Sequence, residues 1–212
     1  MNKYQKVMGL FTGYDQYREW TMKPHTQRGY VYASETHIAI QVKNSLLEYD
    51  YPELEEPDFA RVFHVKRALD IVMTLKDMSA TYDRIPYTTT EVCEACGGRG
   101  VVDYVFEYDY NTYTQSGECP VCDGEGLVES HIKKKDVRYS VILLDSCEAM
   151  KQKYFGILIA AMKALEIEAI RLVGSNDVGL IFEADDDIKI VISTYIEDKW
   201  KEYVVMFKEE TR

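Results

Sequence analysis

Two stretches of the sequence share the formula CxxCxGxG: Cys93-Glu94-Ala95-Cys96-Gly97-Gly98-Arg99-Gly100 and Cys119-Pro120-Val121-Cys122-Asp123-Gly124-Glu125-Gly126. Each CxxC turn presents two sulfur atoms to one metal ion, and four thiolates complete the tetrahedron that zinc prefers. The glycines permit the positive φ angles that the backbone needs where it folds around the ion. The sequence therefore predicts one structural zinc ion held by Cys93, Cys96, Cys119 and Cys122, with no coordination position left open for catalysis.

The main alternative for these cysteines is a redox-active dithiol, since a CxxC pair can also form a disulfide. The matched glycine tails favour a metal site, and two CxxC pairs are not the pattern of a secreted disulfide framework. The fifth cysteine, Cys147, is interpreted as a small buried side chain. The N-terminus lacks a secretory pattern, and the longest apolar run is too short to cross a bilayer. We therefore expect a cytoplasmic protein with no membrane role.

The segment between the two CxxC pairs has the period of a β-strand. Tyr104, Phe106, Tyr108 and Tyr110 alternate with other residues, mostly acidic, and residues 111–117 offer turn formers. A β-hairpin here would bring the second pair of cysteines to the first. We expect the four rings to lie on one face of this hairpin and to form a partner-binding surface. The alternative is that the rings pack on the rest of the protein or shield a hairpin too small to stand alone.

Charge separates this region from the rest of the chain. Residues 91–130 hold nine acidic side chains and one basic side chain, Arg99. Their formal charge of −8 is most of the −11 that the whole chain carries. Such a break in composition predicts an inserted module. We place a zinc-binding hairpin at residues 89–130, within a discontinuous host domain formed by residues 1–88 and 131–212. Its acidity disfavours nucleic-acid binding by the inserted module, because phosphates need Lys and Arg.

The host residues predict an α+β fold, an antiparallel sheet with two main helices. Residues 65–78 show helical spacing of apolar side chains, and a second helix is expected from Ser146 to about residue 165. The expected strands, rich in aromatic and β-branched residues or bounded by turn formers, are 18–27, 29–42, 137–144, 169–173, 179–183, 188–195 and 203–207.

The doubled CxxCxGxG resembles the cysteine-rich zinc domain of DnaJ-type chaperones over residues 91–128. That family carries four repeats and two zinc ions, whereas this chain has two repeats. The chain also lacks a J-domain and its His-Pro-Asp motif. The resemblance therefore implies a zinc module and not a chaperone.

Outside the module, the chain resembles a bacterial-type DNA sliding clamp in three places. The stretch Tyr32-Ala33-Ser34-Glu35-Thr36-His37-Ile38-Ala39 is similar to the Ala-Thr-Asp-Gly-His-Arg-Leu strand of clamps. His64 to Val72 resembles a clamp strand that enters a helix. The stretch from Tyr154 to Ser193 resembles the helix and strands that close a clamp domain. The resemblance implies a clamp-like fold and, because clamps build rings from several domains, a homo-oligomer.

The clamp resemblance also implies two sets of site residues. A peptide pocket for protein partners would be lined by Ser34, Thr36, His37, Ile38, Val191 and Ile192. The alternative for His37 is a histidine with satisfied hydrogen bonds in a strand. Double-stranded DNA would face a set of basic side chains, which are Lys66, Arg67, Lys76, Lys133, Lys134, Lys135, Arg138, Lys151 and Lys153. The alternative for these is the ordinary solvated surface of helices.

The sequence is compatible with three functions. The first is a non-catalytic, zinc-containing, clamp-like accessory factor of DNA replication or of a mobile element. The second is a protein-interaction module that uses the acidic aromatic hairpin and has no role with DNA. The third is a dithiol oxidoreductase. We expect no enzyme activity, because no Ser-His-Asp set, phosphate loop or paired-carboxylate motif stands out.

Overall fold

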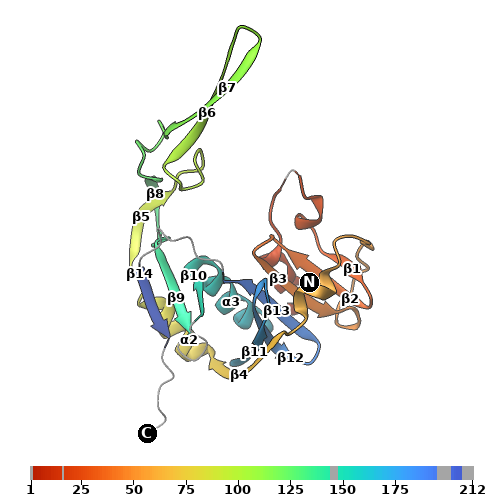
Figure 1. The fold of residues 1–212 in the computed structure, drawn as a ribbon. Helices are drawn as coiled ribbons and strands as arrows, with labels where there is room; N and C mark the ends of the chain where they lie inside the picture. The colour runs from red at the N-terminus through yellow and green to blue at the C-terminus, as the bar shows by residue number, and fades with distance from the viewer. Residues whose placement is uncertain (1, 16, 144–147, 195–201, 207–212) are drawn as a thin grey trace. The chain divides into compact units, whose positions relative to one another are not determined.

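The computed structural model describes residues 2–15, 17–143, 148–194 and 202–206, and it divides into two compact units (Figure 1). The first unit comprises residues 1–84 and 139–212, and the second comprises residues 85–138. The predicted insertion, 89–130, lies inside the second unit, which also takes in the residues immediately before and after it.

Within the described residues, the first unit is built on an antiparallel sheet of seven strands, and the antiparallel arrangement confirms the sequence prediction. Their order is β1 (His25–Gln27), β2 (Tyr30–Ser34), β3 (Ile38–Lys43), β13 (Ile188–Ser193), β12 (Gly179–Asp185), β11 (Ala169–Ser175) and β4 (Arg67–Thr74). Every neighbouring pair in this sheet is antiparallel. A second sheet of the unit joins β10 (Glu148–Lys151), β9 (Tyr139–Leu143) and β14 (Glu202–Met206), with β14 parallel to β9.

Among its described residues, the first unit has three α-helices: α1 (Lys3–Met8), α2 (Leu75–Asp83) and α3 (Gln152–Leu165). Short 3-10 segments cover residues 9–11, 19–21, 44–46 and 59–63, the last of these being η4 (Phe59–Phe63). The longest helix, α3, buries eight of its side chains, which agrees with its apolar sequence. None of the helices described is long and apolar enough to span a bilayer.

Several predicted element bounds are wrong. The expected helix at 65–78 is strand β4 up to Thr74 and helix α2 only from Leu75, because β4 pairs along its length with β11. The expected strand at 29–42 is the β2–β3 hairpin, and only the end of 18–27 is a strand. The second helix begins at Gln152, after β10. Ser146 and Cys147 lie outside the described residues.

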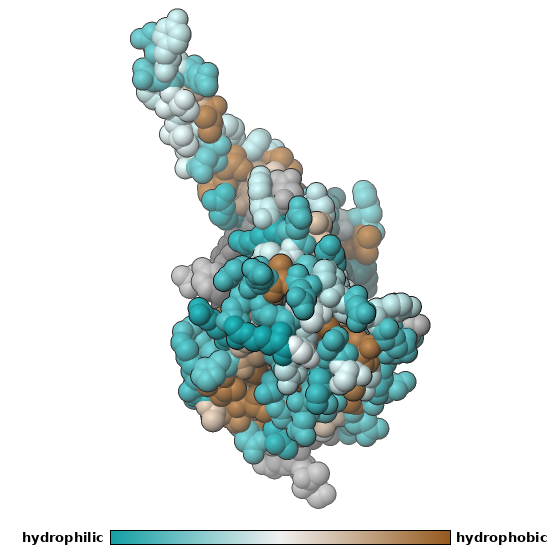
Figure 2. Space-filling view, turned by 90° about the vertical axis from the view of Figure 1, so that its right-hand side faces the viewer, coloured by the Kyte–Doolittle hydropathy of each residue, from teal (hydrophilic) through white to brown (hydrophobic). Residues whose placement is uncertain are grey.

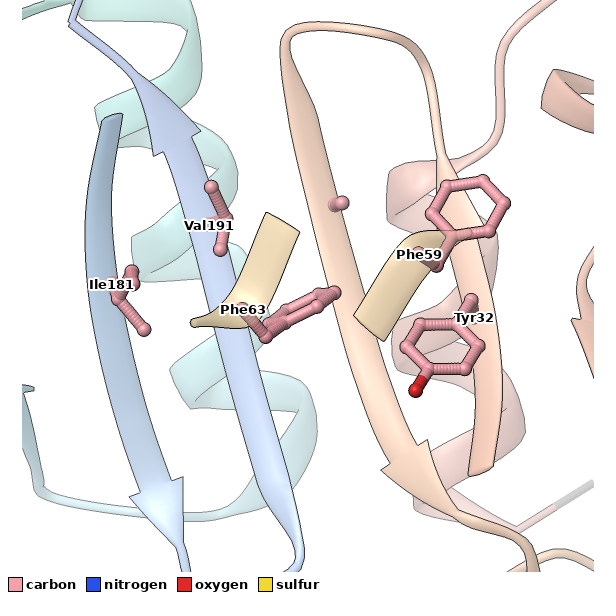
Figure 3. Close-up of a cluster of buried hydrophobic side chains, with 6 residues drawn as sticks. Tyr32, Phe59, Phe63, Ile181 and Val191 are labelled. Atoms are coloured by element: carbon pink, nitrogen blue, oxygen red, sulfur yellow. The ribbon is translucent and has the colours of Figure 1, made fainter. Parts of the chain in front are cut away.

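Hydrophobic side chains cover both faces of the seven-stranded sheet. On one face, η4 packs Phe59 and Phe63 against Tyr32, Ile181 and Val191, and helices lie behind the same strands (Figure 3). Side chains alternate across a strand, so Ile190 and Ile192, both fully buried, face the helix side. Burial on both faces fixes the register of these central strands.

The second unit consists of two successive two-stranded sheets (Figure 1). One sheet pairs β5 (Tyr87–Val92) with β8 (Leu127–Lys135). The other pairs β6 (Val101–Tyr108) with β7 (Asn111–Glu118), and these two strands lie between β5 and β8 in the sequence. The knuckles, residues 93–100 and 119–126, lie between the two pairs along the chain. The β6–β7 turn is Asp109-Tyr110, with φ angles of 49° and 63°. The turn expected within 111–117 is wrong, since these residues form β7.

Candidate metal centre and apolar cavity

The four predicted cysteine ligands come together in the second unit. Their sulfur atoms all lie within 4.8 Å of one another, and all four side chains are buried. The Sγ atoms of Cys93 and Cys119 are 3.8 Å apart, and so are those of Cys96 and Cys122. With zinc–sulfur bonds of about 2.3 Å, the corners of a regular tetrahedron lie about 3.8 Å apart. Two of the sulfur–sulfur distances thus equal the edge of such a tetrahedron, and the cluster could hold one metal ion.

The two knuckles hold each other through a reciprocal pair of backbone hydrogen bonds. The N–H of Cys93 donates to the carbonyl of Gly126 at 3.0 Å, and the N–H of Cys119 donates to the carbonyl of Gly100 at 2.9 Å. The amide of Gly100 also donates to Sγ of Cys96 at 3.3 Å, and that of Gly126 to Sγ of Cys122 at 3.1 Å. Amide donors of this kind stabilise negative charge on a thiolate ligand.

Steric constraints require glycine at the last position of each CxxCxGxG repeat. Gly100 and Gly126 have φ angles of 75° and 77°, in the region that favours glycine. A Cβ atom on Gly100 would collide with the carbonyl oxygen of Gly124, and one on Gly126 would collide with that of Gly98. The repeats are therefore matched because each knuckle packs its backbone against the other.

The thiols of the cluster differ in acidity. Burial opposes ionisation of Cys96, but the amide of Gly100 and the neighbouring thiols lower its pKa to about 7. For Cys122, burial raises the pKa to about 12. A divalent cation would compensate the charge of further thiolates, since its ligands must be deprotonated.

The aromatic residues expected on the hairpin are exposed. Phe106 and Tyr113 occupy directly opposite positions on β6 and β7, and their rings stack at 5.3 Å. Tyr104 and Tyr108 share their face by strand alternation. Tyr110 does not, because it lies in the turn and is fully exposed.

An apolar cavity of about 200 Å³ lies in the first unit, beside the β2–β3 turn. Five of the six residues of the predicted peptide pocket line it: Ser34, Thr36, His37, Ile38 and Val191. Ile192 does not, since it is fully buried on the opposite face of the sheet. Sequence reasoning missed the other walls, which are Trp20, Ala39, Pro57, Asp58, Phe59, Val62 and Val178. The aromatic and apolar residues of 59–63 were the available signal.

The turn at the mouth of this cavity is strained. Thr36 has a φ angle of 82°, which is unfavourable for a β-branched residue. The hydroxyl of Ser34 holds the turn by accepting from the N–H of Thr36 at 3.1 Å and donating to the carbonyl of Ile38 at 3.0 Å. His37 is exposed in this turn, and its ring lies 5.9 Å from that of Tyr154. The alternative of a histidine within a strand is thus wrong.

The predicted DNA-facing residues do not share one element. Lys66 precedes β4 and Arg67 begins it, Lys76 lies on α2, Lys151 ends β10 and Lys153 lies on α3, whereas Lys133, Lys134, Lys135 and Arg138 belong to the second unit. Carboxylates neutralise several of them. Lys66 pairs with Asp177, Lys134 with Glu91, Arg138 with Asp136 and Lys153 with Glu35. Lys135 is buried, and its Nζ donates to the carbonyl of Ile85.

Comparison with solved structures finds bacterial sliding clamps. The DNA polymerase III beta chain of Streptococcus pneumoniae matches with a TM-score of 0.49 and 11% identity, over 93% of this chain and 64% of that one. The beta subunit of Borrelia burgdorferi matches with a TM-score of 0.49 and 8% identity, over 93% and 62%. That of Thermotoga maritima matches with a TM-score of 0.46 and 10% identity, over 93% and 65%. The chain thus spans just under two thirds of the length of these clamps.

No family model matches the chain, and no curated protein matches it.

Proposed function

We propose that this chain is a non-catalytic, zinc-containing, clamp-like accessory protein of DNA replication or of a mobile element, and that its first unit captures a short peptide of a partner protein. One observation carries the proposal. Residues that the sequence resemblance assigned to a peptide pocket converge from β2, β3 and β13 on a single apolar cavity. Ser34, Thr36, His37 and Ile38 are neighbours at the β2–β3 turn, but Val191 joins them from about 150 residues further along the chain, and this long-range convergence supports the resemblance.

The cavity suits one or two apolar side chains. Its walls include Trp20, Phe59 and Val191, and polar groups of Thr36, His37 and Asp58 stand among them. This mixture of apolar walls and a few polar groups is typical of sites that bind small ligands or peptide side chains. Backbone strain such as that at Thr36 is concentrated at functional sites in proteins.

The metal in the second unit is zinc in this proposal, and its role is structural. Four thiolates favour zinc over the harder divalent cations, and four filled positions leave none for a substrate. The ion would connect the knuckles and thereby hold the root of the β6–β7 hairpin. A two-stranded hairpin is otherwise marginal in water.

A binding experiment tests the peptide function. The probe is a fluorescently labelled peptide with a Leu-Phe pair between polar residues, and its control is the same peptide with Ser-Ser. Val178 lines the cavity and Val72 on β4 does not, although both are 43% exposed. We expect the Leu-Phe peptide alone to bind, and Val178→Ser to weaken binding by about tenfold while Val72→Ser leaves it unchanged. Equal binding of both peptides, or equal effects of both substitutions, would reject the function.

Contact with double-stranded DNA and assembly into a homo-oligomer are parts of the same proposal. The carboxylate partners of Lys66 and Lys153 predict weak DNA binding by an isolated chain, because a paired lysine releases fewer counterions. Mass measurement in solution, with and without duplex DNA, tests both parts. If the chain is a monomer and does not bind duplex DNA at low salt, the DNA and oligomer parts of the proposal are rejected, and only the peptide site stands.

The alternative, a protein-interaction module with no role with DNA, is favoured by a different observation. The rings of the β6–β7 hairpin are exposed in the second unit. A surface there is compatible with a peptide site in the first unit.

A further inference from the structure

The β6–β7 hairpin has two chemically different faces. The strand register places Tyr104, Phe106, Tyr108 and Tyr113 on one face, together with Val102, Asn111, Gln115 and Gly117. This aromatic face contains no charged residue. The opposite face carries Asp103, Glu107 and Glu118, together with Val101, Val105, Thr112, Thr114 and Ser116. We call it the acidic face.

The aromatic face is open. The exposed fractions of Tyr104, Phe106, Tyr108 and Tyr113 are 46%, 50%, 72% and 43%. They present together roughly 400 Å² of aromatic surface, if one side chain presents about 200 Å². Figure 2 shows near-neutral and hydrophobic side chains interspersed with hydrophilic ones along this arm of the chain. The largest exposed apolar patch of a typical monomer has about this size, and such a patch is often functional.

Both strands of the hairpin also have a free edge within the described residues, because the sheet contains only β6 and β7. A free edge can pair with an extended segment of another protein, which then alternates its side chains between the two faces. β6 is the more suitable of the two edges, because it carries most of the aromatic and acidic side chains of the hairpin. It contributes Tyr104, Phe106 and Tyr108 to the aromatic face, and Asp103 and Glu107 to the acidic face.

Charge selects among the occupants of this edge. Residues 100–132 contain seven acidic side chains and no Lys or Arg. A second copy of the hairpin would be repelled by the same charge, and single-stranded nucleic acid would lack the positive groove that accompanies stacked rings in its usual sites. A segment rich in Lys or Arg would be attracted.

We infer that the β6 edge of the hairpin binds an extended segment of a partner protein in which apolar and basic residues alternate. The apolar side chains lie on the aromatic face, and the basic side chains meet Asp103 and Glu107 on the acidic face. The zinc knuckles hold the hairpin in place for this pairing. The site is separate from the cavity of the first unit, so either can fail without the other.

The test uses the zinc-loaded full chain and a labelled peptide of about ten residues, the length of a typical long strand, in which Arg and Leu alternate. Its control has the same composition with all Arg residues before all Leu residues. We expect the alternating peptide to bind at least about tenfold more tightly than the block peptide. Equal affinity would overturn the proposal, because bulk charge would then explain the binding. Absence of binding, or tighter binding of a single-stranded oligonucleotide, would overturn it as well.

Variants locate the site. Tyr104→Thr with Tyr108→Thr removes rings without changing charge, and Asp103→Asn with Glu107→Gln removes charge without changing rings. A matched control, Glu48→Gln with Asp50→Asn, removes two exposed acids of the first unit. Both hairpin variants should lose at least about tenfold in affinity, with zinc content unchanged, and the control should bind like the wild type. If the control loses as much as the hairpin variants, the site is not on the hairpin.

Discussion

The backbone N–H of Cys119 donates a hydrogen bond of 2.9 Å to the carbonyl oxygen of Gly100. This bond joins the first residue of the second knuckle to the last residue of the first knuckle. The reciprocal bond, from Cys93 to Gly126, closes the arrangement. Metal ligation and backbone pairing therefore reinforce one another, and a change in either should affect both.

Substitution at the last glycine of a repeat should abolish metal binding. Gly100→Ala places a Cβ against the carbonyl of Gly124 at a positive φ angle, so the knuckles must separate. Gly97→Ala is the matched control, since Gly97 has a φ angle of 59° but open space around it. It should cost only about 1–2 kcal/mol in the stability of the knuckle. Zinc content after purification checks the pair, and retention of zinc by Gly100→Ala would contradict the steric argument.

The affinity of the site for zinc should decrease as the pH is lowered. The pKa of Cys122 is raised to about 12 by burial, and the net effect of amides and neighbouring thiols on Cys96 is a pKa of about 7. Zinc must displace protons from the thiols, so acid competes with the metal. We expect proton release on zinc addition, and weaker zinc binding in chelator competition at about pH 6 than at about pH 8. Binding that is independent of pH would show that thiolates are not the ligands.

Asp136 should stabilise the second unit through its carboxylate. It is 2% exposed, and burial alone would raise its pKa, but hydrogen bonds from the side chain and backbone of Arg138 give a net lowering. This stability is present above the pKa of the unfolded chain and is lost as the pH falls through the lower pKa of the folded state.

Asp136→Asn should accordingly cost about 1–3 kcal/mol at neutral pH, and less below the folded-state pKa. Hydrogen exchange of the β5 and β8 amides measures the cost. Asp123→Asn, at an exposed position, is the control. Equal protection in both variants would show that the Asp136–Arg138 pair contributes nothing.

Thr36→Gly should stabilise the first unit. The φ angle of 82° is strained for threonine and accessible to glycine, and relief of about 1 kcal/mol is expected, partly offset by the greater entropy of glycine in the unfolded chain. Thr36→Val keeps the β-branch and the strain, so it should gain nothing. Thermal unfolding of the first unit compares the two. A lower melting temperature for Thr36→Gly would show that the threonine side chain contributes more than its strain costs.

The zinc centre could be predicted from the sequence because its ligands are local. Spacing within each CxxCxGxG repeat fixes two ligands. The alternation over residues 103–110 indicates one strand of a β-hairpin, whose other strand returns the chain to the first pair of cysteines. The position of the turn was not predictable by the same means. Asp109 and Tyr110 both adopt positive φ angles, where Asn-Gly would be usual, and the polar residues 111–117 have the composition of a turn.

The host fold shows the opposite limit. Apolar residues at 68, 69, 72, 75 and 78 fit a helix, yet the first three lie in β4. Pairing with β11, about 100 residues away in sequence, decides their conformation, and tertiary pairing of this kind overrides local propensity. The same distance conceals most of the cavity, whose walls Trp20, Phe59 and Val178 come from three separate segments.

Metal analysis of the purified chain, prepared without chelators, tests the central claim most directly. The four-cysteine geometry predicts about one zinc ion per chain, absent from Cys122→Ser, while the first unit of that variant unfolds at the wild-type temperature. A chain without zinc that carries a disulfide between Cys93 and Cys96 would contradict the account.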